Sequence, residues 1–361
     1  MDDIDHMRHA LALARRGVGR TAPNPSVGCV IVNKGRVVGR GRTGDGGRPH
    51  AEQIALAQAG EAANGATAYV TLEPCAQKTK TPSCAESLAA AKISKVIVAA
   101  LDPDKRTNGA GIAKMRDAGV AVETGVLAKE AAETHAGFFM RETQGRPYVT
   151  LKIAQSLDGK TATASGESKW ITGETARRFG HLMRAQNDAI LIGVNTALAD
   201  DPELTCRLAG LESASPVRVV LDSRLRLSDW SKLAQSANET PVIVYTAVEG
   251  GAGLKACGVE VVKVQKDARG RPDIGAVLKD LAKRGLTRLL VEGGATVHAA
   301  FLDRGLVDRL EVFTAPMALG AAGQGAIEAL AVLGLDEASR FSRVDMRRLG
   351  PDMLESFVLR A

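Results

Sequence analysis

The sequence predicts two three-layer α/β/α domains, each with a mostly parallel β-sheet covered by helices on both faces. The chain has 361 residues, 45% hydrophobic and 24% charged, which indicates a folded soluble protein that is too long for one ordinary core. Short apolar runs of strand length alternate with stretches of helical period along the chain. A polar run at residues 143–147 interrupts this alternation, so we expect domains at 1–145 and 146–361.

The first domain is expected to begin with a helix at residues 5–16, where apolar residues recur at helical spacing before a breaker-rich run. Apolar runs on either side of the Lys34-Gly35 turn then predict a hairpin formed by residues 27–32 and 36–39. The remaining expected elements are helices at 51–60, 85–92, 112–118 and 129–142, and strands at 68–72, 95–100 and 120–124.

The second domain repeats the alternation. Helical patterns follow several of its expected strands. These strands are at 148–154, 189–193, 217–222, 241–246, 259–264, 288–292, 310–314, 341–347 and 353–359.

Composition narrows the function classes. The formal net charge is +6 and only 3% of residues are aromatic. Nucleic-acid-binding surfaces normally show clustered Lys and Arg, and single-strand binders add aromatic stacking platforms; neither feature is visible here. The excess positive charge therefore favours small anionic substrates, or serves solubility alone.

The chain also lacks the features of a membrane or secreted protein. No run of 18 apolar residues is present, and the sequence starts MDDID where a signal peptide would be basic. Five cysteines are an odd number in a long chain, which argues against a disulfide framework. We expect a cytoplasmic protein with reduced thiols.

Three residues of the first domain have the chemistry of a catalytic zinc site. His50 opens an expected helix, Cys75 follows an expected strand, and Cys84 starts another helix. Two thiolates and one imidazole leave a fourth zinc position open for water, as in catalytic rather than structural sites. The positive end of the helix at Cys84 should favour the thiolate of that residue.

Glu52 lies two residues after His50, where a proton shuttle belongs. In zinc deaminases, an activated hydroxide attacks a ring carbon that carries an amino group, and a nearby Glu carries the proton to the leaving ammonia. The common spacing between the cysteines is Cys-x-x-Cys, whereas eight residues separate Cys75 from Cys84. The alternative interpretation is a surface His, an exposed Glu and two packed cysteines.

The motifs APNPSVG at 22–28, PHAE at 49–52, TLEPC at 71–75 and TPSC at 81–84 resemble the bifunctional riboflavin-biosynthesis deaminase/reductase family. The resemblance implies a cytidine-deaminase-like zinc domain in which His50, Cys75 and Cys84 bind Zn²⁺. It also implies that Glu52 is the proton donor and that Asn24 holds the pyrimidine. Gln77 stands where the family commonly has a His, and Lys80 retains a positive charge for a phosphate or carbonyl contact.

The likeness continues through KIAQSLDGK at 152–160, SGESKWIT at 165–172, DDPELT at 200–205 and VEGG at 291–294, which resemble the reductase half. It implies a dihydrofolate-reductase-like fold that uses NADPH. The implied cofactor contacts are Ala154, Trp170, Thr196, Asp200, Ser223, Gly293, Gly294, Ala295 and Thr296. The implied substrate contacts are Lys152, Ser168, Arg184, Leu204, Arg207 and Glu292.

The residues alone support the reductase half less strongly. No Gly-x-Gly-x-x-Gly turn follows a strand, although the Gly293-Gly294 pair between a strand and a helix could let backbone amides approach a pyrophosphate. Arg184 and Arg207 suit a ribose phosphate, because a guanidinium fork matches phosphate oxygens. Lys152 or Asp200 could orient or protonate the opened ribose carbonyl. Trp170 could instead be a core residue.

The sequence thus predicts consecutive steps of riboflavin biosynthesis. Zinc-hydrolytic deamination of 2,5-diamino-6-(5-phosphoribosylamino)pyrimidin-4(3H)-one is followed by NADPH reduction of the ribosyl side chain to ribityl. We expect a phosphorylated pyrimidine substrate, a homo-oligomer, and neither nucleic acid nor membrane as a partner. The alternatives are a nucleic-acid-editing zinc deaminase with an RNA-binding C-terminal half, and a non-enzymatic module with structural zinc.

Overall fold

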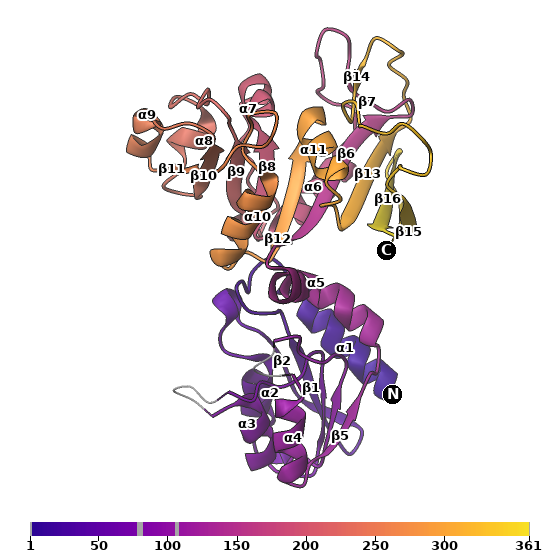
Figure 1. Ribbon diagram of the computed structural model, residues 1–361. Coiled ribbons are helices and arrows are strands. Elements are labelled where there is room, and N and C mark those ends of the chain that lie inside the picture. Colours follow the sequence, from indigo (N-terminus) through magenta and orange to yellow (C-terminus); the bar gives the residue numbers. More distant parts are fainter. Residues whose placement is uncertain (1, 78–81, 105–107, 361) are drawn as a thin grey trace. The chain divides into compact units, whose positions relative to one another are not determined.

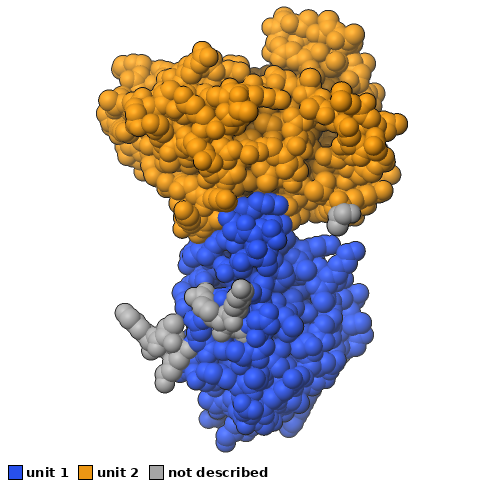
Figure 2. Space-filling view, in the orientation of Figure 1, with its two compact units in different colours: residues 1–146 blue, residues 147–361 orange. Residues whose placement is uncertain are grey.

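The computed structural model describes residues 2–77, 82–104 and 108–360. Contacts within the chain divide it into two compact units, Met1–Arg146 and Pro147–Ala361, which Figure 2 colours separately. No helix in the described part of the chain combines the length and apolar character needed to cross a lipid bilayer.

Unit 1 contains five strands and five α-helices among its described residues. The helices are α1 (Asp3–Arg15), α2 (Ala51–Ala59), α3 (Cys84–Ala90), α4 (Ala110–Asp117) and α5 (Ala128–Gln144). The strands are β1 (Gly28–Asn33), β2 (Arg36–Arg42), β3 (Thr67–Val70), β4 (Lys95–Val98) and β5 (Ala121–Thr124). Every helix and strand expected in this part of the sequence is present.

The sheet of unit 1 has the order β2-β1-β3-β4-β5 and is mixed. Strands β3, β4 and β5 are parallel, but β1 is antiparallel to both β2 and β3. The expectation of a mostly parallel sheet is therefore wrong for this unit. The short turn at Lys34-Gly35 joins β1 directly to β2, which forces an antiparallel pair, and β1 then lies beside β3 in the opposite sense.

Helices cover both faces of this sheet, as expected. Helices α1 and α5 lie on one face (Figure 1), where Met7 of α1 and Ala131 of α5 pack with Val30 of β1. Helices α2, α3 and α4 cover the other face, where their apolar side chains pack with Ile31 and the neighbouring strands. The alternation of Val30 and Ile31 between the two clusters follows from the two-residue period of a strand.

Two strand glycines let these helices approach the sheet backbone closely. A Cβ atom at Gly28 of β1 would lie 1.9 Å from the carbonyl oxygen of Ala10 in α1. A Cβ atom at Gly41 of β2 would lie 2.3 Å from the carbonyl oxygen of Ala51 in α2. Only glycine fits such contacts, so the beginning of α2 is fixed against β2 by backbone packing.

Unit 2 is built around a nine-stranded sheet with the order β11-β10-β9-β8-β12-β6-β13-β16-β15. Its strands are β6 (Tyr148–Ser156), β8 (Ala189–Gly193), β9 (Val217–Leu221), β10 (Val242–Thr246), β11 (Glu260–Lys263), β12 (Arg288–Gly293), β13 (Arg309–Ala315), β15 (Phe341–Leu349) and β16 (Asp352–Leu359). From β11 to β13 all neighbours are parallel, and β16 and β15 complete one edge with antiparallel pairs. The mostly parallel sheet expected here is confirmed.

Helices cover both faces of the large sheet. They are α6 (Glu174–Ala185), α7 (Val194–Asp200), α8 (Lys232–Gln235), α9 (Ala252–Ala256), α10 (Ile274–Lys283) and α11 (Ala295–Asp303). Helices α10 and α11 contribute Leu278 and Phe301 to one core cluster, and α6 and α8 contribute Met183 and Leu233 to the cluster on the opposite face. A separate two-stranded ladder of β7 (Lys160–Ala162) and β14 (Gln324–Gly325) was not expected from the sequence.

Candidate active sites

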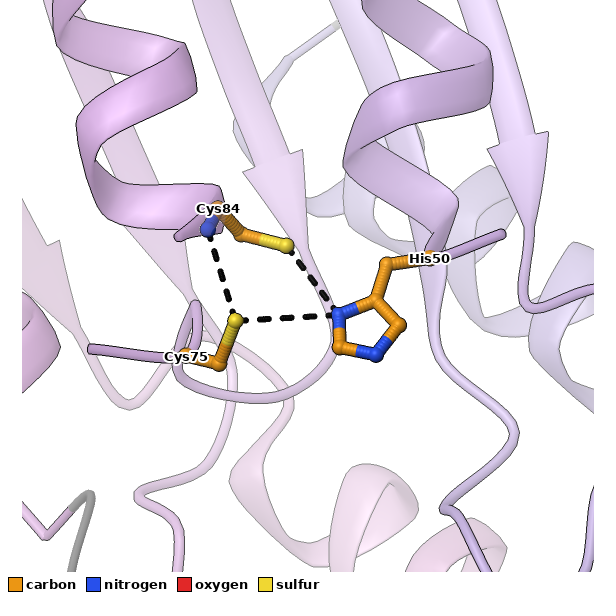
Figure 3. Close-up of side chains that lie close together, drawn as sticks. All are labelled: His50, Cys75 and Cys84. Carbon is orange, nitrogen blue, oxygen red and sulfur yellow. Dashed lines mark hydrogen bonds between the residues drawn. The ribbon is translucent and has the colours of Figure 1, made fainter. Parts of the chain in front are cut away.

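The three predicted zinc ligands meet at one point of unit 1 (Figure 3). His50 immediately precedes α2, Cys75 lies in the segment after β3, and Cys84 is the first residue of α3. The His50 Nδ1 atom is 3.2 Å from Cys84 Sγ and 3.7 Å from Cys75 Sγ. Their possible ligand atoms all lie within 4.8 Å of one another. Two sulfur atoms and one imidazole nitrogen in this arrangement fit Zn²⁺.

The start of α3 brings the two thiols together. The backbone N–H of Cys84 donates to Cys75 Sγ at 3.3 Å, and the N–H of Ala85 donates to the Cys75 carbonyl at 3.3 Å. A hydrogen bond with the Cys84 side chain, opposed by burial, lowers the pKa of the Cys75 thiol to about 4. The same contact, together with burial, raises the pKa of Cys84. The backbone N–H at the start of α3 donates to Cys75 Sγ, and the effect of this helix end on the Cys84 thiolate stays a prediction.

Glu52 and Asn24 line the same cavity as the three ligands, a space of about 280 Å³. Glu52 lies in the first turn of α2 and is only 3% exposed, and burial raises the pKa of its carboxyl group. Asn24 donates from Nδ2 to the carbonyl oxygen of Gly47 at 3.1 Å, which fixes the orientation of its amide. Gln77 also lines the cavity, whereas Lys80 lies outside the described residues.

Sequence reasoning missed several charged residues of this pocket, including Arg48, Glu73 and Asp102. Asp102 is 8% exposed, and burial raises its pKa to about 6. In the sequence, Glu73 is part of the TLEPC motif at residues 71–75, and no role was predicted for it. Its position two residues before the predicted zinc ligand Cys75 was the one signal in the sequence.

Unit 2 contains a larger cavity of about 990 Å³ that gathers nearly all of the predicted reductase residues. Those lining it are Lys152, Ala154, Ser168, Trp170, Arg184, Thr196, Asp200, Leu204, Arg207, Glu292, Gly293, Gly294, Ala295 and Thr296. Ser223 differs, because it follows β9 and is not among the lining residues.

The glycine pair Gly293-Gly294 joins the end of β12 to α11 and has the conformation expected of a turn that a ligand can approach. Gly294 has a φ of 65°, and a Cβ atom there would lie 2.9 Å from Thr196 Oγ1. Glycine thus brings the start of α11 close to α7. The turn places the N-terminus of α11 beside the cavity, where backbone N–H groups suit an anionic group such as a pyrophosphate.

A largely buried ion pair lies in the lining of this cavity. Arg184 donates from Nε and Nη2 to the two carboxylate oxygens of Glu292, each at 2.8 Å, and Lys152 Nζ lies 3.9 Å from Glu292. Burial alone would raise the pKa of Glu292, but the charges of Arg184 and Lys152 outweigh it and lower the pKa to about 2. The guanidinium fork that we predicted for a ribose phosphate is directed to Glu292 instead.

Other charged residues around this cavity are more exposed. Arg207 pairs with Glu203 at 3.0 Å, and both side chains are about half exposed. Trp170 is 66% exposed and stacks under the guanidinium group of Arg177, whose carbon lies 4.6 Å from the ring centroid. The alternative of Trp170 as a core residue is therefore wrong.

Two further cavity residues, Arg177 and His181, precede Arg184 on α6 at helical spacing. That spacing puts all three on one face of the helix, which is a signal present in the sequence.

Arg218 of β9 has no exposed surface. It donates to the Glu203 carbonyl at 3.1 Å and thereby holds the segment that precedes Leu204. A fully buried arginine in an apolar strand gave no sequence signal for this role.

Comparisons with known proteins agree with both halves. Residues 1–100 match the family described as the cytidine and deoxycytidylate deaminase zinc-binding region, and residues 147–354 match the RibD C-terminal domain. The chain is 41% identical to the riboflavin biosynthesis protein RibD of Aquifex aeolicus over 98% of each chain. It is 39% identical to RibD of Escherichia coli, also over 98% of each.

Solved structures show the same likeness over the whole chain. RibD of Acinetobacter baumannii has a TM-score of 0.89 and 39% identity, with 99% of each chain covered. A diaminohydroxyphosphoribosylaminopyrimidine deaminase/5-amino-6-(5-phosphoribosylamino)uracil reductase of Thermotoga maritima has a TM-score of 0.88 and 33% identity, again over 99% of each chain. The expected cytidine-deaminase-like and reductase folds are thereby confirmed.

Proposed function

Because the chain belongs to the RibD family of riboflavin biosynthesis, we propose that each of its two pockets carries one of the two RibD reactions. It is a bifunctional deaminase/reductase that uses Zn²⁺ and NADPH. We assign the deaminase to unit 1 and the reductase to unit 2. The substrates proposed are those in the name of the Thermotoga maritima relative, a diaminopyrimidine ribosylamine phosphate and its deaminated product.

Neither alternative function is favoured. Residues 147–354 match a RibD reductase domain rather than an RNA-binding module. Within the part of the chain that the structure describes, only His50, Cys75 and Cys84 form a group of possible metal ligands, three rather than the four of a structural zinc site.

In the deaminase pocket, His50, Cys75 and Cys84 would hold the ion. When bound, Zn²⁺ supplies a Lewis acid that makes hydroxide available near pH 7. Glu52, buried in the same cavity, takes a proton from the attacking water and passes it to the amino nitrogen. The C–N bond breaks, ammonia leaves, and oxygen replaces nitrogen on the ring. Asn24, with its amide fixed by Gly47, orients the pyrimidine.

In the reductase cavity, the Gly293–Thr296 turn and Trp170 would contact NADPH, which supplies the hydride for the opened ribose. Lys152 provides the proton for the carbonyl oxygen. Its ammonium group lies 3.9 Å from Glu292, and its side chain is 20% exposed. Asp200 is 38% exposed and lies 3.9 Å from Lys169, so it is the less sheltered of the two candidates. Arg207 and Ser168 lie in the lining to receive the phosphate.

The meeting of His50, Cys75 and Cys84 in one cavity with Glu52 carries the deaminase assignment. Replacing Glu52 with Gln should slow ammonia release by about 10²- to 10⁴-fold, because the proton shuttle is lost. NADPH oxidation with the deaminated product should stay within about twofold of wild type, as should both activities of Glu61→Gln, an exposed control. Normal ammonia release by Glu52→Gln would refute the assignment.

We also propose that the enzyme acts in the cytoplasm as a homo-oligomer on a small phosphorylated pyrimidine, without nucleic acid. All five cysteines are free, which supports a reducing compartment. Light scattering during size-exclusion chromatography tests the oligomer; a mass of one chain at micromolar concentration would contradict it.

A further inference from the structure

Glu73 is a second buried carboxylate of the deaminase pocket, and its oxygens face backbone N–H groups. It is 3% exposed and lies between β3 and the ligand Cys75. Oε1 accepts hydrogen bonds from the N–H of Gly111 at 3.0 Å and of Ile112 at 3.3 Å. Oε2 accepts from Gly109 at 3.0 Å and from Asp102 at 3.4 Å. Among the described residues, no Lys or Arg forms an ion pair with it.

Three of these four donors belong to the start of α4. A helix leaves its first N–H groups without partners inside the helix. Gly109, the residue that precedes α4, has no side chain to cap them, so the carboxylate of Glu73 takes that role from a distant part of the sequence. A Cβ atom at Gly111 would lie 1.9 Å from the Pro74 carbonyl oxygen. The backbone of α4 therefore touches the residue between Glu73 and Cys75.

Helix α4 also holds the segment on the other side of Cys75. Lys114, one turn further along α4, donates from Nζ to the Ala76 carbonyl at 2.8 Å and lies 3.3 Å from Glu86 Oε1. Glu86 accepts the N–H of Ser83 at 2.9 Å and so caps α3, which begins with Cys84. Helix α4 thus contacts the residues on both sides of Cys75. It also contacts Glu86, the side chain that caps α3, the helix of Cys84.

The fourth donor connects Glu73 to the pocket wall. The N–H of Asp102 belongs to the segment after β4, and the Asp102 side chain lines the cavity. A carboxylate can accept from all four donors at once because both oxygens are acceptors. An amide offers one oxygen and would turn its own N–H groups toward backbone N–H groups.

We infer that Glu73 is a positioning residue of the deaminase: it fastens α4 to the Glu73–Ala76 segment and thereby sets the two thiols and the pocket wall in register. This inference rests on the proposed roles of His50, Cys75 and Cys84 as zinc ligands. Glu73 itself binds neither ion nor substrate in this assignment. Its removal should loosen the zinc site and widen the range of positions that Cys75 samples.

The test uses the full chain loaded with zinc and measures the rate at which a colorimetric chelator removes the ion, well below the unfolding temperature. Glu73→Gln should release zinc about 10- to 100-fold faster than wild type, the usual effect of losing a partner that orients metal ligands. The kcat/KM for ammonia release should fall by a similar factor, with NADPH oxidation unchanged. Glu73→Asp, which keeps the charge, should recover part of both losses, and the exposed control Glu61→Gln should match wild type.

A purely structural role predicts a different pattern, in which the unfolding temperature of Glu73→Gln falls but zinc release from the folded protein keeps the wild-type rate. That pattern would overturn the inference. If Glu73→Gln does not fold, Lys114→Met carries the test: about threefold faster zinc release supports the inference, and a wild-type rate overturns it. Wild-type protein that binds no zinc would instead overturn the proposed function.

Discussion

The pocket of unit 1 concentrates its chemistry in three ligand atoms within 4.8 Å of one another, whereas unit 2 spreads its predicted contacts around a cavity of about 990 Å³. In unit 1 two sulfur atoms and a nitrogen face one another in readiness for a cation. In unit 2 two opposite charges of the lining, those of Arg184 and Glu292, already neutralise each other. The function of the metal site therefore depends on each single ligand atom. The structure of the larger cavity depends on ion pairs between its lining side chains.

The largest effect should come from removing one ligand atom of unit 1. Cys75→Ala should bind little zinc and slow ammonia release by more than about 10⁴-fold, because a bound ion would lower the pKa of water to about 7. Metal analysis and an ammonia assay measure both. Cys257→Ala, a free cysteine of unit 2, is the control. Full zinc occupancy in Cys75→Ala would contradict the dependence of the unit 1 site on each single ligand atom.

The next effect should come from breaking a charge pair of unit 2. Glu292→Gln leaves Arg184 and Lys152 without their shared carboxylate, and removing one partner of a buried pair costs about 3–5 kcal/mol. Urea unfolding should show this loss, and NADPH oxidation should fall while ammonia release persists. Glu203→Gln, which removes only the exposed partner of Arg207, should change stability by less than about 1 kcal/mol. Equal losses of unfolding free energy in the two variants would argue against the importance of the Arg184–Glu292 ion pair for this cavity.

A smaller effect is expected behind the wall of the same cavity. The buried Arg218 donates to the carbonyls of Glu203, Ser236 and Thr240, so Arg218→Met removes these charged hydrogen bonds at a cost of about 1–3 kcal/mol. Because Glu203 precedes the lining residue Leu204, the KM for the pyrimidine substrate should rise more than kcat falls. A loss confined to kcat would contradict this reasoning.

The last effect concerns pH. An Asp carboxyl group has a pKa of about 3.9 in an unfolded chain. Burial raises the pKa of Asp102 to about 6, so the folded state favours its protonated form and the stability of unit 1 should fall as pH rises from about 4 to 6. Asp102→Asn should remove this slope. Thermal unfolding of both proteins at pH 4.5 and 7 measures the change of stability with pH. The same change in Asp102→Asn as in wild type would show that another group is responsible.

The regular elements of both units could be predicted from the sequence because hydrophobic period and turn residues are local signals. The partnership of β1 with β3 could not, since strand order depends on contacts between distant residues. The ladder of β7 and β14 was missed for the same reason, and its strands are too short to show alternation.

The two sites differ in the same way. His50, Cys75 and Cys84 were predicted because metal ligands have distinctive chemistry wherever the fold carries them. The ion pair between the Arg184 guanidinium group and the Glu292 carboxylate was not predicted. More than a hundred residues separate the two, and either side chain could have faced solvent. Lys80 lies outside the described residues, and the position of Ser223 away from the cavity lining leaves its cofactor role a prediction.

The backbone contact at Gly41 has a consequence for the motions of the deaminase pocket. With no side-chain layer between β2 and the start of α2, there is little that can rearrange beneath His50 and Glu52. Local opening of such a region requires the helix to separate from the sheet as a whole. The amide hydrogens of the second turn of α2 should accordingly be among the slowest in unit 1 to exchange with deuterium.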